Sequence, residues 1–405
     1  MQDSRPIAMA RASANEKTRR TRVVVFWGIL LVLLLLVLEA SAAVIAQLLA
    51  ASRSQHLFWR PDLAVASASW ARTHNIDEEL GWPLPDMVTS GTRDQSGAKR
   101  NTDFPETSEP CLSAYGDSFV WGDDIPLQDG WIEQLSRLLG CRIANFGVSG
   151  YGTDQAFIRY RRTTHDKAPT VILGIFPDDI IRNVNQYRAF IGMDLEPYFV
   201  KGRFVQDSLH KLQWVPRPHL DGKTFLELHQ KPSEFLPYEH FLPDSRDGPV
   251  AVRFPYTLTL LRFAMLPRIW NRLRDQTPWF DLYSPDHPSG AVPLTIAITH
   301  AFVQEAEQRG ARVFTVMLPS PGSFRSWNRF GAPDYAAFVK AMADAGLSIF
   351  DPLPDMARAL GGQSYCAIYV VESSCSGHFG IVGSALVAQV IASELRKRQL
   401  VAPRS

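Results

Sequence analysis

The chain has 405 residues, which is long enough for one large domain with additional segments. Its 42 basic and 41 acidic residues leave a formal net charge of +1, so no global field favours nucleic acid or another strongly charged partner. The composition by itself does not indicate a substrate.

The N-terminal segment joins a basic stretch to one long apolar run. Six cations lie within the first 22 residues, and residues 23–46 then read VVVFWGILLVLLLLVLEASAAVIA. This run is close to the roughly 20 apolar residues that a bilayer core requires, although Glu39 and Ser41 interrupt it. Cations ahead of an apolar segment favour a cytoplasmic N-terminus. We therefore expect a cytoplasmic basic tail over 1–22 and a single transmembrane anchor over 23–46, with the remainder exported.

A cleaved signal peptide is the alternative, because Ala40, Ser41 and Ala42 resemble a cleavage site. The apolar run exceeds the roughly 7 to 15 residues of a typical signal core, which favours the anchor. Both interpretations place the rest of the chain outside the cytoplasm, where four cysteines can form two disulfides. Pairing Cys111 with Cys141 and Cys366 with Cys375 is one of three connectivities, and four buried thiols are the alternative.

The middle of the chain changes from a polar segment to a repeating pattern of strands and helices. Residues 47–110 are rich in polar and turn residues and are expected to form a stalk and edge segment. From Cys111, short apolar runs alternate with helical ones, which indicates βαβ units and a parallel sheet. The expected strands lie within 111–119, 141–150, 170–176, 311–319 and 347–354, and the expected helices lie within 129–140, 153–165, 293–310, 334–346 and 381–398.

The pattern fails over 188–293, where aromatic, charged and proline residues follow no clear period. A structureless loop of that length is unusual in a compact domain, so we expect short helices and a cap or substrate wall. The first three strands each end in a polar loop. Because ligands bind at the carboxyl ends of the strands in an open parallel sheet, these three loops are expected to meet.

Four short blocks carry the candidate chemistry. They are GDSF at 116–119, NFGVSGYGTD at 145–154, GIFPDDIIRN at 174–183 and SGHFGIVG at 376–383. A serine at a sharp turn from strand to helix gains exposure and nearby backbone amides. The GDSF block alone is weak evidence for a catalytic serine. The other three blocks, which follow it in order, strengthen that evidence.

These blocks resemble those of the SGNH/GDSL hydrolase superfamily, and in particular its membrane-tethered bacterial branch, in which ELGW-like sequence precedes the GDSF block. The resemblance covers residues 77–187 and 311–396. It implies a three-layer α/β/α flavodoxin-like parallel sheet over 111–398, with 188–293 as a cap-like insertion. It further implies Ser118 as the nucleophile, the amides of Ser118 and Gly150 as oxyanion donors, and His378 as the base.

The residue chemistry agrees with these roles. A serine hydroxyl needs a base within hydrogen-bond reach, and an imidazole titrates near neutral pH. His165, His300 and His287 have weaker claims, because two lie in helical patterns and His287 lies in the insertion.

The sequence departs from the family pattern at two points. Where the family offers an asparagine that donates to the oxyanion, this chain has Asp178. An ionised carboxylate would repel the oxyanion, so Asp178 must be protonated, turned away, or replaced in its role by Asn183 or Asn185; capping of the following helix is an equally good explanation for Asp178. The acid usually found just before the histidine is also missing, which leaves Glu372, Asp351 or no acid at all.

We therefore expect a serine-dependent ester hydrolase or acyltransferase, with no cofactor and no metal, since no cluster of ligand residues shows metal spacing. By analogy with relatives, we expect its substrate to be an acyl ester of an extracytoplasmic glycan or lipid, with acetyl as the expected acyl group. The expected location is the bacterial inner membrane, with the catalytic domain periplasmic or extracellular. The alternative is a noncatalytic, membrane-tethered glycan-binding or assembly protein on a decayed SGNH scaffold.

Overall fold

The computed structural model describes residues 5–52, 55–72, 76–82, 91–192 and 196–401, with side chains from residue 19 onward. Most side chains of the predicted basic tail therefore lie outside the described residues. The chain forms two compact units. The smaller unit contains Met1–Arg60 and Pro249–Met265, and the larger contains Pro61–Gly248 and Leu266–Ser405.

A parallel five-stranded sheet forms the centre of the larger unit. Its strand order is β3-β2-β4-β8-β9, and every neighbouring pair is parallel. Counted along the chain this order is 2-1-3-4-5, which is the flavodoxin-like arrangement. The strands are β2 (Leu112–Tyr115), β3 (Ile143–Asn145), β4 (Thr170–Ile175), β8 (Arg312–Met317) and β9 (Ile349–Phe350).

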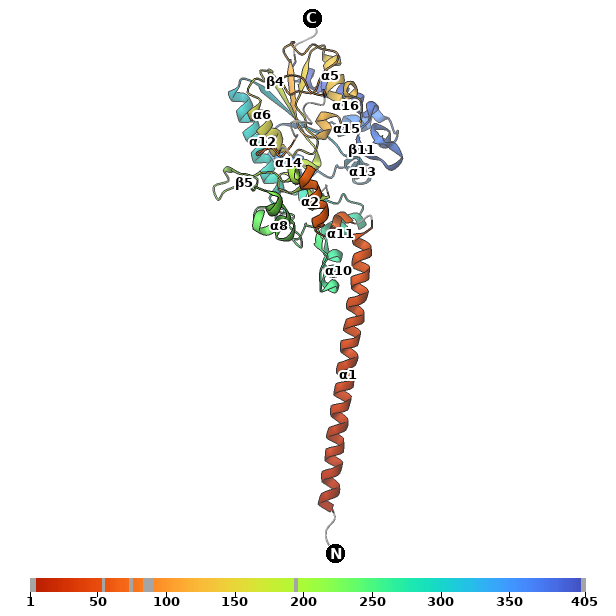
Figure 1. Cartoon of the computed structure of the whole chain (residues 1–405). Coiled ribbons are helices and arrows are strands. Elements are labelled where there is room, and N and C mark those ends of the chain that lie inside the picture. The colour runs from red at the N-terminus through yellow and green to blue at the C-terminus, as the bar shows by residue number, and fades with distance from the viewer. Residues whose placement is uncertain (1–4, 53–54, 73–75, 83–90, 193–195, 402–405) are drawn as a thin grey trace. The chain divides into compact units, whose positions relative to one another are not determined.

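Helices cover both faces of this sheet and make it a three-layer structure. Helices α6 and α12 pack together on one face, and α5 and α16 pack together on the other (Figure 1). All six residues of β4 are buried, as expected for a central parallel strand that is covered on both sides. These helices are α5 (Trp131–Leu139), α6 (Thr153–Arg162), α12 (Ala291–Gln308) and α16 (Ile381–Lys397).

The predicted three-layer α/β fold is confirmed. Each of the five expected strands and five expected helices is present, including α14 (Ala336–Asp344). Gly140 ends α5 in the left-handed conformation. Gly152 is the N-cap residue of α6. Further elements of the larger unit are α2 (Leu63–Arg72), α4 (Ser118–Trp121), α7 (Pro177–Arg182), α13 (Pro321–Phe330), α15 (Leu353–Leu360), β10 (Tyr369–Val371) and β11 (Ser376–Phe379).

The region predicted as an insertion contains short elements. Strands β5 (Arg203–Gln206) and β6 (Leu212–Val215) form an antiparallel hairpin. Short helices follow in the larger unit, as expected for a segment too long to remain unstructured. They are α8 (Gly222–Gln230), α9 (Pro232–Phe235) and α11 (Pro267–Leu273).

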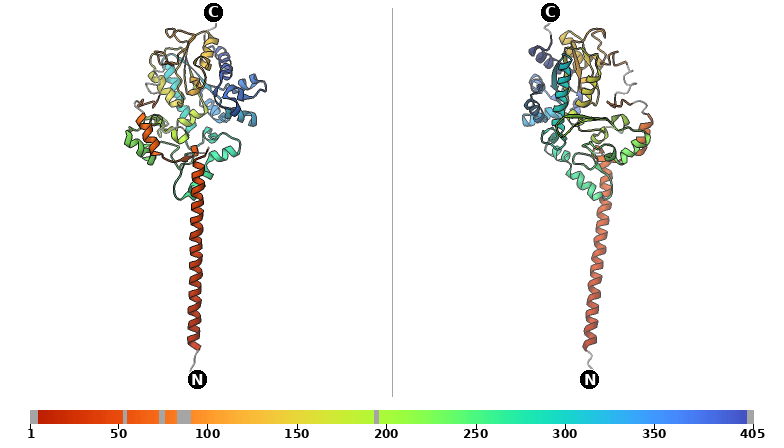
Figure 2. Two further views of the ribbon diagram at one scale, coloured as in Figure 1. Left: turned by 45° about the vertical axis from the view of Figure 1, so that its right-hand side comes forward. Right: turned by 90° about the vertical axis from the view of Figure 1, so that its left-hand side faces the viewer.

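The smaller unit is dominated by one unbroken helix, α1 (Arg5–Ala50) (Figure 2). Its part from Arg19 to Ala50 is long and apolar enough to cross a membrane, a property that a signal sequence shares. Strand β1 (Phe58–Trp59) pairs in parallel with β7 (Val250–Ala251), and α10 (Tyr256–Met265) packs on α1. The N-terminal segment and a segment from the middle of the sequence thus form this unit.

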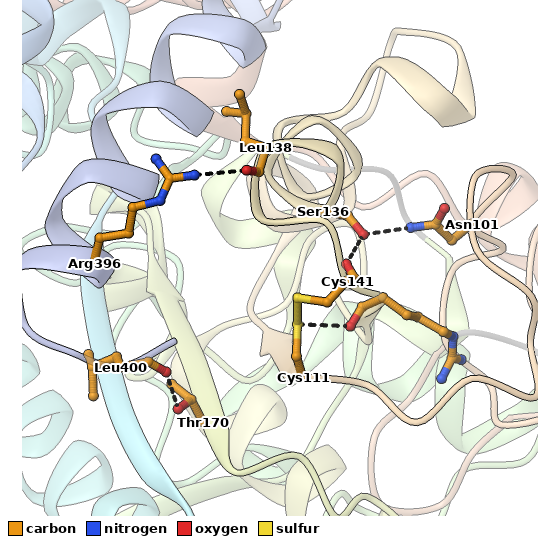
Figure 3. The surroundings of a disulfide bond; sticks show 9 residues. Asn101, Cys111, Ser136, Leu138, Cys141, Thr170, Arg396 and Leu400 are labelled. Atoms are coloured by element: carbon orange, nitrogen blue, oxygen red, sulfur yellow. Dashed lines mark hydrogen bonds between the residues drawn. A yellow bond between two sulfur atoms is a disulfide. The ribbon is translucent and has the colours of Figure 1, made fainter. Parts of the chain in front are cut away.

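Both predicted disulfides are present. Cys111–Cys141 joins the starts of β2 and β3, and Cys366–Cys375 lies ahead of β11. Around the first bridge, the Ser136 hydroxyl donates to the Cys141 carbonyl and accepts from Asn101 (Figure 3). A bridge across 30 residues removes loop entropy from the unfolded chain that is equivalent to about 3 to 4 kcal/mol in the chain-entropy account.

Candidate active site

The GDSF block forms the turn from β2 into α4. Ser118 is the first residue of α4, and the carboxylate of its N-cap residue Asp117 accepts a hydrogen bond from the amide of Phe119 at 2.9 Å. A Cβ at Gly116 would lie 2.4 Å from the Val120 side chain and 2.7 Å from the Gly174 carbonyl oxygen. Glycine is therefore required sterically at 116, and the turn places Ser118 at the carboxyl end of β2.

The VSGYG loop after β3 is held by two neighbouring segments. The Trp82 indole donates to the Ser149 carbonyl at 2.7 Å, and the Tyr151 hydroxyl donates to the Trp82 carbonyl at 2.6 Å. Gly150, at φ +78°, occupies the left-handed region that suits glycine. The buried Arg188 guanidinium donates to the Gly150 carbonyl from two nitrogens, each at 3.3 Å. The ELGW-like segment thus supports the loop that was predicted to supply an oxyanion donor.

Arg182 of α7 connects the loops after the first three strands. Its Nη1 donates at 2.9 Å to the carboxylates of Asp117 and Asp179 and to the carbonyl of Tyr151. The prediction that these three polar loops meet is therefore confirmed. Two carboxylates share one cation, and burial, followed by the Asp117 charge, raises the pKa of Asp179 well above its ordinary value.

His378 lies on β11 beside the nucleophile turn. Its ring centroid is 4.9 Å from that of Phe119, the residue directly after Ser118. Its Nδ1 is 2.7 Å from Oδ2 of Asp124, which fits a hydrogen bond from the imidazole to the carboxylate. The opposite ring nitrogen, Nε2, is then the one left to act as base.

Asp124 is the carboxylate partner of His378 that sequence reasoning did not find. The candidates taken from the sequence were Glu372 and Asp351, and neither carboxylate is the partner of His378. Asp351 instead accepts hydrogen bonds from the Tyr335 hydroxyl and the Leu353 amide. Asp124 lies six residues after Ser118, in the WGDD turn, with a φ of +66°. A turn aspartate that tolerates this conformation, close after the nucleophile block, was the available signal.

The Ser118 hydroxyl is directed toward its neighbour in this structure. Its hydrogen bond goes to Oδ2 of Asp117 at 3.4 Å and not to His378. A serine hydroxyl turns about one bond, and catalytic hydrogen bonds often tighten only when substrate binds. The structure therefore brings the two segments together, and a nucleophilic role for Ser118 would need its hydroxyl to turn toward His378.

Asp178 lies on the first turn of α7, in the same charge cluster. Burial is the main cause of a raised pKa for Asp178; Arg182 opposes this shift and the Asp117 charge adds to it. The amide nitrogen of Asn183 donates to Thr295, and that of Asn185 donates to the Tyr187 carbonyl and to Glu239. Both asparagine amides therefore have structural partners, which leaves Asp178 at the position where the family has its donor.

No protein-family model matches the chain, and no curated protein matches it. Solved structures do match. A member of the lipolytic protein G-D-S-L family from Veillonella parvula is 12% identical at a TM-score of 0.33, and the match covers 71% of this chain and 98% of that one. The esterase EstA from Pseudoalteromonas is 9% identical at a TM-score of 0.32, with 71% and 97% covered. TesA is 12% identical at a TM-score of 0.33, with 71% and 98% covered.

The topology and the positions of the motifs agree with what the sequence resemblance implied. The strand order is flavodoxin-like, the GDSF serine follows the first strand, and the SGHFG histidine precedes the last helix. The larger unit thus has a three-layer α/β fold with a flavodoxin-like parallel sheet.

Proposed function

We propose that this chain is a membrane-anchored serine esterase or acyltransferase, with Ser118 as nucleophile, His378 as base and Asp124 as the orienting acid. The observation that carries the proposal is the 2.7 Å contact between His378 and Asp124, next to the GDSF turn. An imidazole that is oriented by a carboxylate and lies beside a serine at the start of a helix is the arrangement that nucleophilic acyl transfer requires.

The reaction proceeds through an acyl-enzyme. The Ser118 oxygen attacks the ester carbonyl carbon while Nε2 of His378 takes the hydroxyl proton. The backbone amides of Ser118 and Gly150 donate to the oxyanion that forms. The C–O bond of the alcohol then breaks, and the alcohol leaves with the proton from His378. Water or a second hydroxyl group repeats these steps in reverse and releases Ser118.

The location and substrate extend this proposal. The apolar part of α1 anchors the protein in the bacterial inner membrane, and the two disulfides fit an exported catalytic unit. In this proposal the acyl group is acetyl, and an extracytoplasmic glycan or lipid carries it. This step rests on analogy with membrane-tethered relatives of the same fold.

Labelling with a fluorophosphonate tests Ser118 directly. The full-length chain, purified in detergent, is expected to become labelled and to release p-nitrophenol from p-nitrophenyl acetate, while Ser118→Ala does neither. Ser374→Ala is the matched control, because Ser374 is an exposed serine four residues before His378. Equal labelling of the unmodified chain and Ser118→Ala would exclude Ser118 as the nucleophile.

A noncatalytic glycan-binding or assembly protein is the second candidate. Asp178 at the donor position and the contact of the Ser118 hydroxyl with Asp117 favour it. Complete absence of labelling in a folded, unmodified chain would support this candidate over the esterase.

Asp178→Asn is expected to raise esterase turnover, on the order of tenfold, because an amide can donate to the oxyanion where a carboxylate repels it. The same change is expected to stabilise the protein at neutral pH. Since burial raises the pKa of Asp178, the folded state binds its proton more tightly than the unfolded state does, and the carboxyl costs stability as pH rises above its ordinary value of 3.8.

Thermal unfolding across pH measures this stability effect. The advantage of the asparagine variant should be largest at neutral pH and should vanish below about pH 3.8. If the stability gain of Asp178→Asn is independent of pH and its turnover is unchanged, Asp178 has no role in the active site.

A further inference from the structure

Three potential metal ligands converge in the larger unit, apart from Ser118 and His378. His240 and Asp247 lie in the loop between α9 and β7, and His287 precedes α12. One ligand atom from each of the three side chains lies within 4.8 Å of the others. Asp247 and His287 are buried, and His240 is partly buried.

Two atoms of this cluster have no hydrogen-bond partner in the described part of the chain. They are Oδ1 of Asp247 and Nε2 of His287, and both are buried. Oδ2 of Asp247 lies 2.7 Å from Nε2 of His240 and 3.7 Å from Nε2 of His287. A buried carboxylate oxygen without a partner is costly, and a cation bound between these groups would remove that cost.

Ser289 lies beside the second ring nitrogen of His287. Nδ1 of His287 accepts a hydrogen bond from the Ser289 amide at 3.2 Å and lies 2.9 Å from the Ser289 hydroxyl. To bind a metal through Nε2, His287 would carry its proton on Nδ1, where the Ser289 hydroxyl can accept it. Metal-binding histidines usually donate their second ring N–H to such an acceptor, which fixes the tautomer.

The guanidinium of Arg268 does not complete the cluster. Arg268 interacts favourably with the charge of Asp247, but its Nη2 donates to the Gly248 carbonyl at 3.1 Å and its guanidinium lies 4.5 Å over the Trp279 ring. Asp247 therefore keeps an oxygen available for another partner.

We propose that His240, Asp247 and His287 bind a Zn²⁺ ion. Two imidazole nitrogens and one carboxylate oxygen form a donor set that zinc accepts, and a water molecule can take the fourth tetrahedral position. Hard cations such as Mg²⁺ favour all-oxygen sites. All four cysteines are in disulfides, so no thiolate competes for the ion.

The site would fix the insertion next to the catalytic loops. Glu239 accepts hydrogen bonds from the amides of Gln186 and Tyr187, and the amide of His240 donates to the Val184 carbonyl. Residues 184–187 directly follow α7, which carries Asp178 and Arg182. Through His240, a bound ion would join residues 184–187 to the segment around His287 that leads into α12.

Metal retention by the full-length chain tests the site. The protein, purified in detergent without a polyhistidine tag and treated with EDTA, is dialysed against ZnCl₂ and then against metal-free buffer. We expect about one zinc per chain by elemental mass spectrometry, and none in His240→Ala/His287→Ala. His219→Ala is the control, because His219 is an exposed histidine of the same region. Ser289→Ala should weaken binding about tenfold.

Cobalt substitution keeps the test independent of folding defects in the variants. Co²⁺ on the unmodified chain should give d–d absorption typical of tetrahedral nitrogen and oxygen ligands. Zinc should raise the thermal unfolding temperature of the unmodified chain, and Mg²⁺ should not. Failure to retain zinc or cobalt at one equivalent, or equal retention by the double variant and the unmodified chain, would overturn the proposal.

A separate observation concerns α10 in the smaller unit. The carboxylate of Glu39, within the apolar run of α1, accepts hydrogen bonds from the amide of Tyr256 and, at 3.2 and 2.8 Å, from the amide and hydroxyl of Thr257. These groups form the first turn of α10, so Glu39 supplies acceptors that the helix start requires. The charge that interrupts the apolar run is thereby explained.

Helix α10 and the residues just before it also carry apolar side chains that are exposed. Phe254, Leu258, Leu261 and Met265 recur at helical spacing, and each is between 39% and 73% exposed. Glu39 lies 17 residues after Arg22, which is about 26 Å along a helix and close to the roughly 30 Å of a bilayer core.

We propose that α10 inserts its apolar face into the outer leaflet beside α1, an inference that rests on the proposed membrane anchor. The experiment attaches spin labels to Leu261→Cys in full-length protein reconstituted into phosphatidylcholine vesicles. Collisions with oxygen should exceed those with a water-soluble nickel complex. Leu209→Cys, on the β5–β6 turn, should show the reverse.

Leu35→Cys in α1 reports on the anchor itself. Lipid exposure at 35 with water exposure at 261 would overturn the inference about α10 alone. Water exposure at both positions would overturn the anchor as well.

Discussion

Asp124→Asn is expected to lower kcat for p-nitrophenyl acetate about ten-thousand-fold, the size of effect seen when an amide replaces the acid of a serine triad. The Asp124 carboxylate lies 2.7 Å from Nδ1 of His378 and stabilises the proton there, which leaves Nε2 free to accept the proton of Ser118. An asparagine can donate to Nδ1 instead and so favours the wrong tautomer. Steady-state kinetics of the full-length chain measure this loss.

Glu372→Gln is the matched control for this prediction. Glu372 is an exposed carboxylate six residues before His378 and was a candidate acid on sequence grounds. Its substitution should leave kcat unchanged, and fluorophosphonate labelling of Asp124→Asn should slow in parallel with turnover. A large loss in Glu372→Gln with none in Asp124→Asn would reverse the assignment of the acid.

Lys201→Met is expected to destabilise the larger unit by about 3 to 5 kcal/mol, because it leaves the buried carboxylate of Asp154 without its cation. The two side chains are fully buried and form an ion pair. Burial lowers the pKa of Lys201 from 10.5 to about 8, although Asp154 opposes this shift. Chemical unfolding of the purified chain in detergent measures the loss.

The double variant Lys201→Met/Asp154→Leu separates pairing from packing. Replacing both charges with apolar side chains should recover most of the loss. The pH dependence has a definite sign as well. Because the folded-state pKa of Lys201 lies below the unfolded value, the unmodified chain should gain stability relative to Lys201→Met as pH rises from about 8 to 10.5. Equal stability of Lys201→Met and the unmodified chain would contradict a structural role for the pair.

The sequence predicted the sheet well because its strands are short, continuous apolar runs. The residues of β4 and β8 are apolar enough to mark buried strands, and a glycine such as Gly140 marks the end of the adjacent helix. The rule that ligands meet at the carboxyl ends of parallel strands then placed the first three polar loops together, which the contacts of Arg182 confirm.

Contacts between distant segments were harder to predict. His240 and His287 are 47 residues apart in a region without periodicity, so no ligand spacing was visible in the sequence. Asp124 was missed because the search for an acid stayed near His378, whereas the acid follows the nucleophile. The role of Glu39 depends on α10, which lies more than 200 residues further along the chain. Tertiary structure, and not local pattern, decides each of these contacts.

The Cys366–Cys375 bridge closes a short loop directly ahead of the strand that carries His378. Reducing agents in the cytosol would keep these thiols apart during synthesis. Once oxidised, the bridge restricts the conformations of this loop and so limits how far the strand that follows it can move.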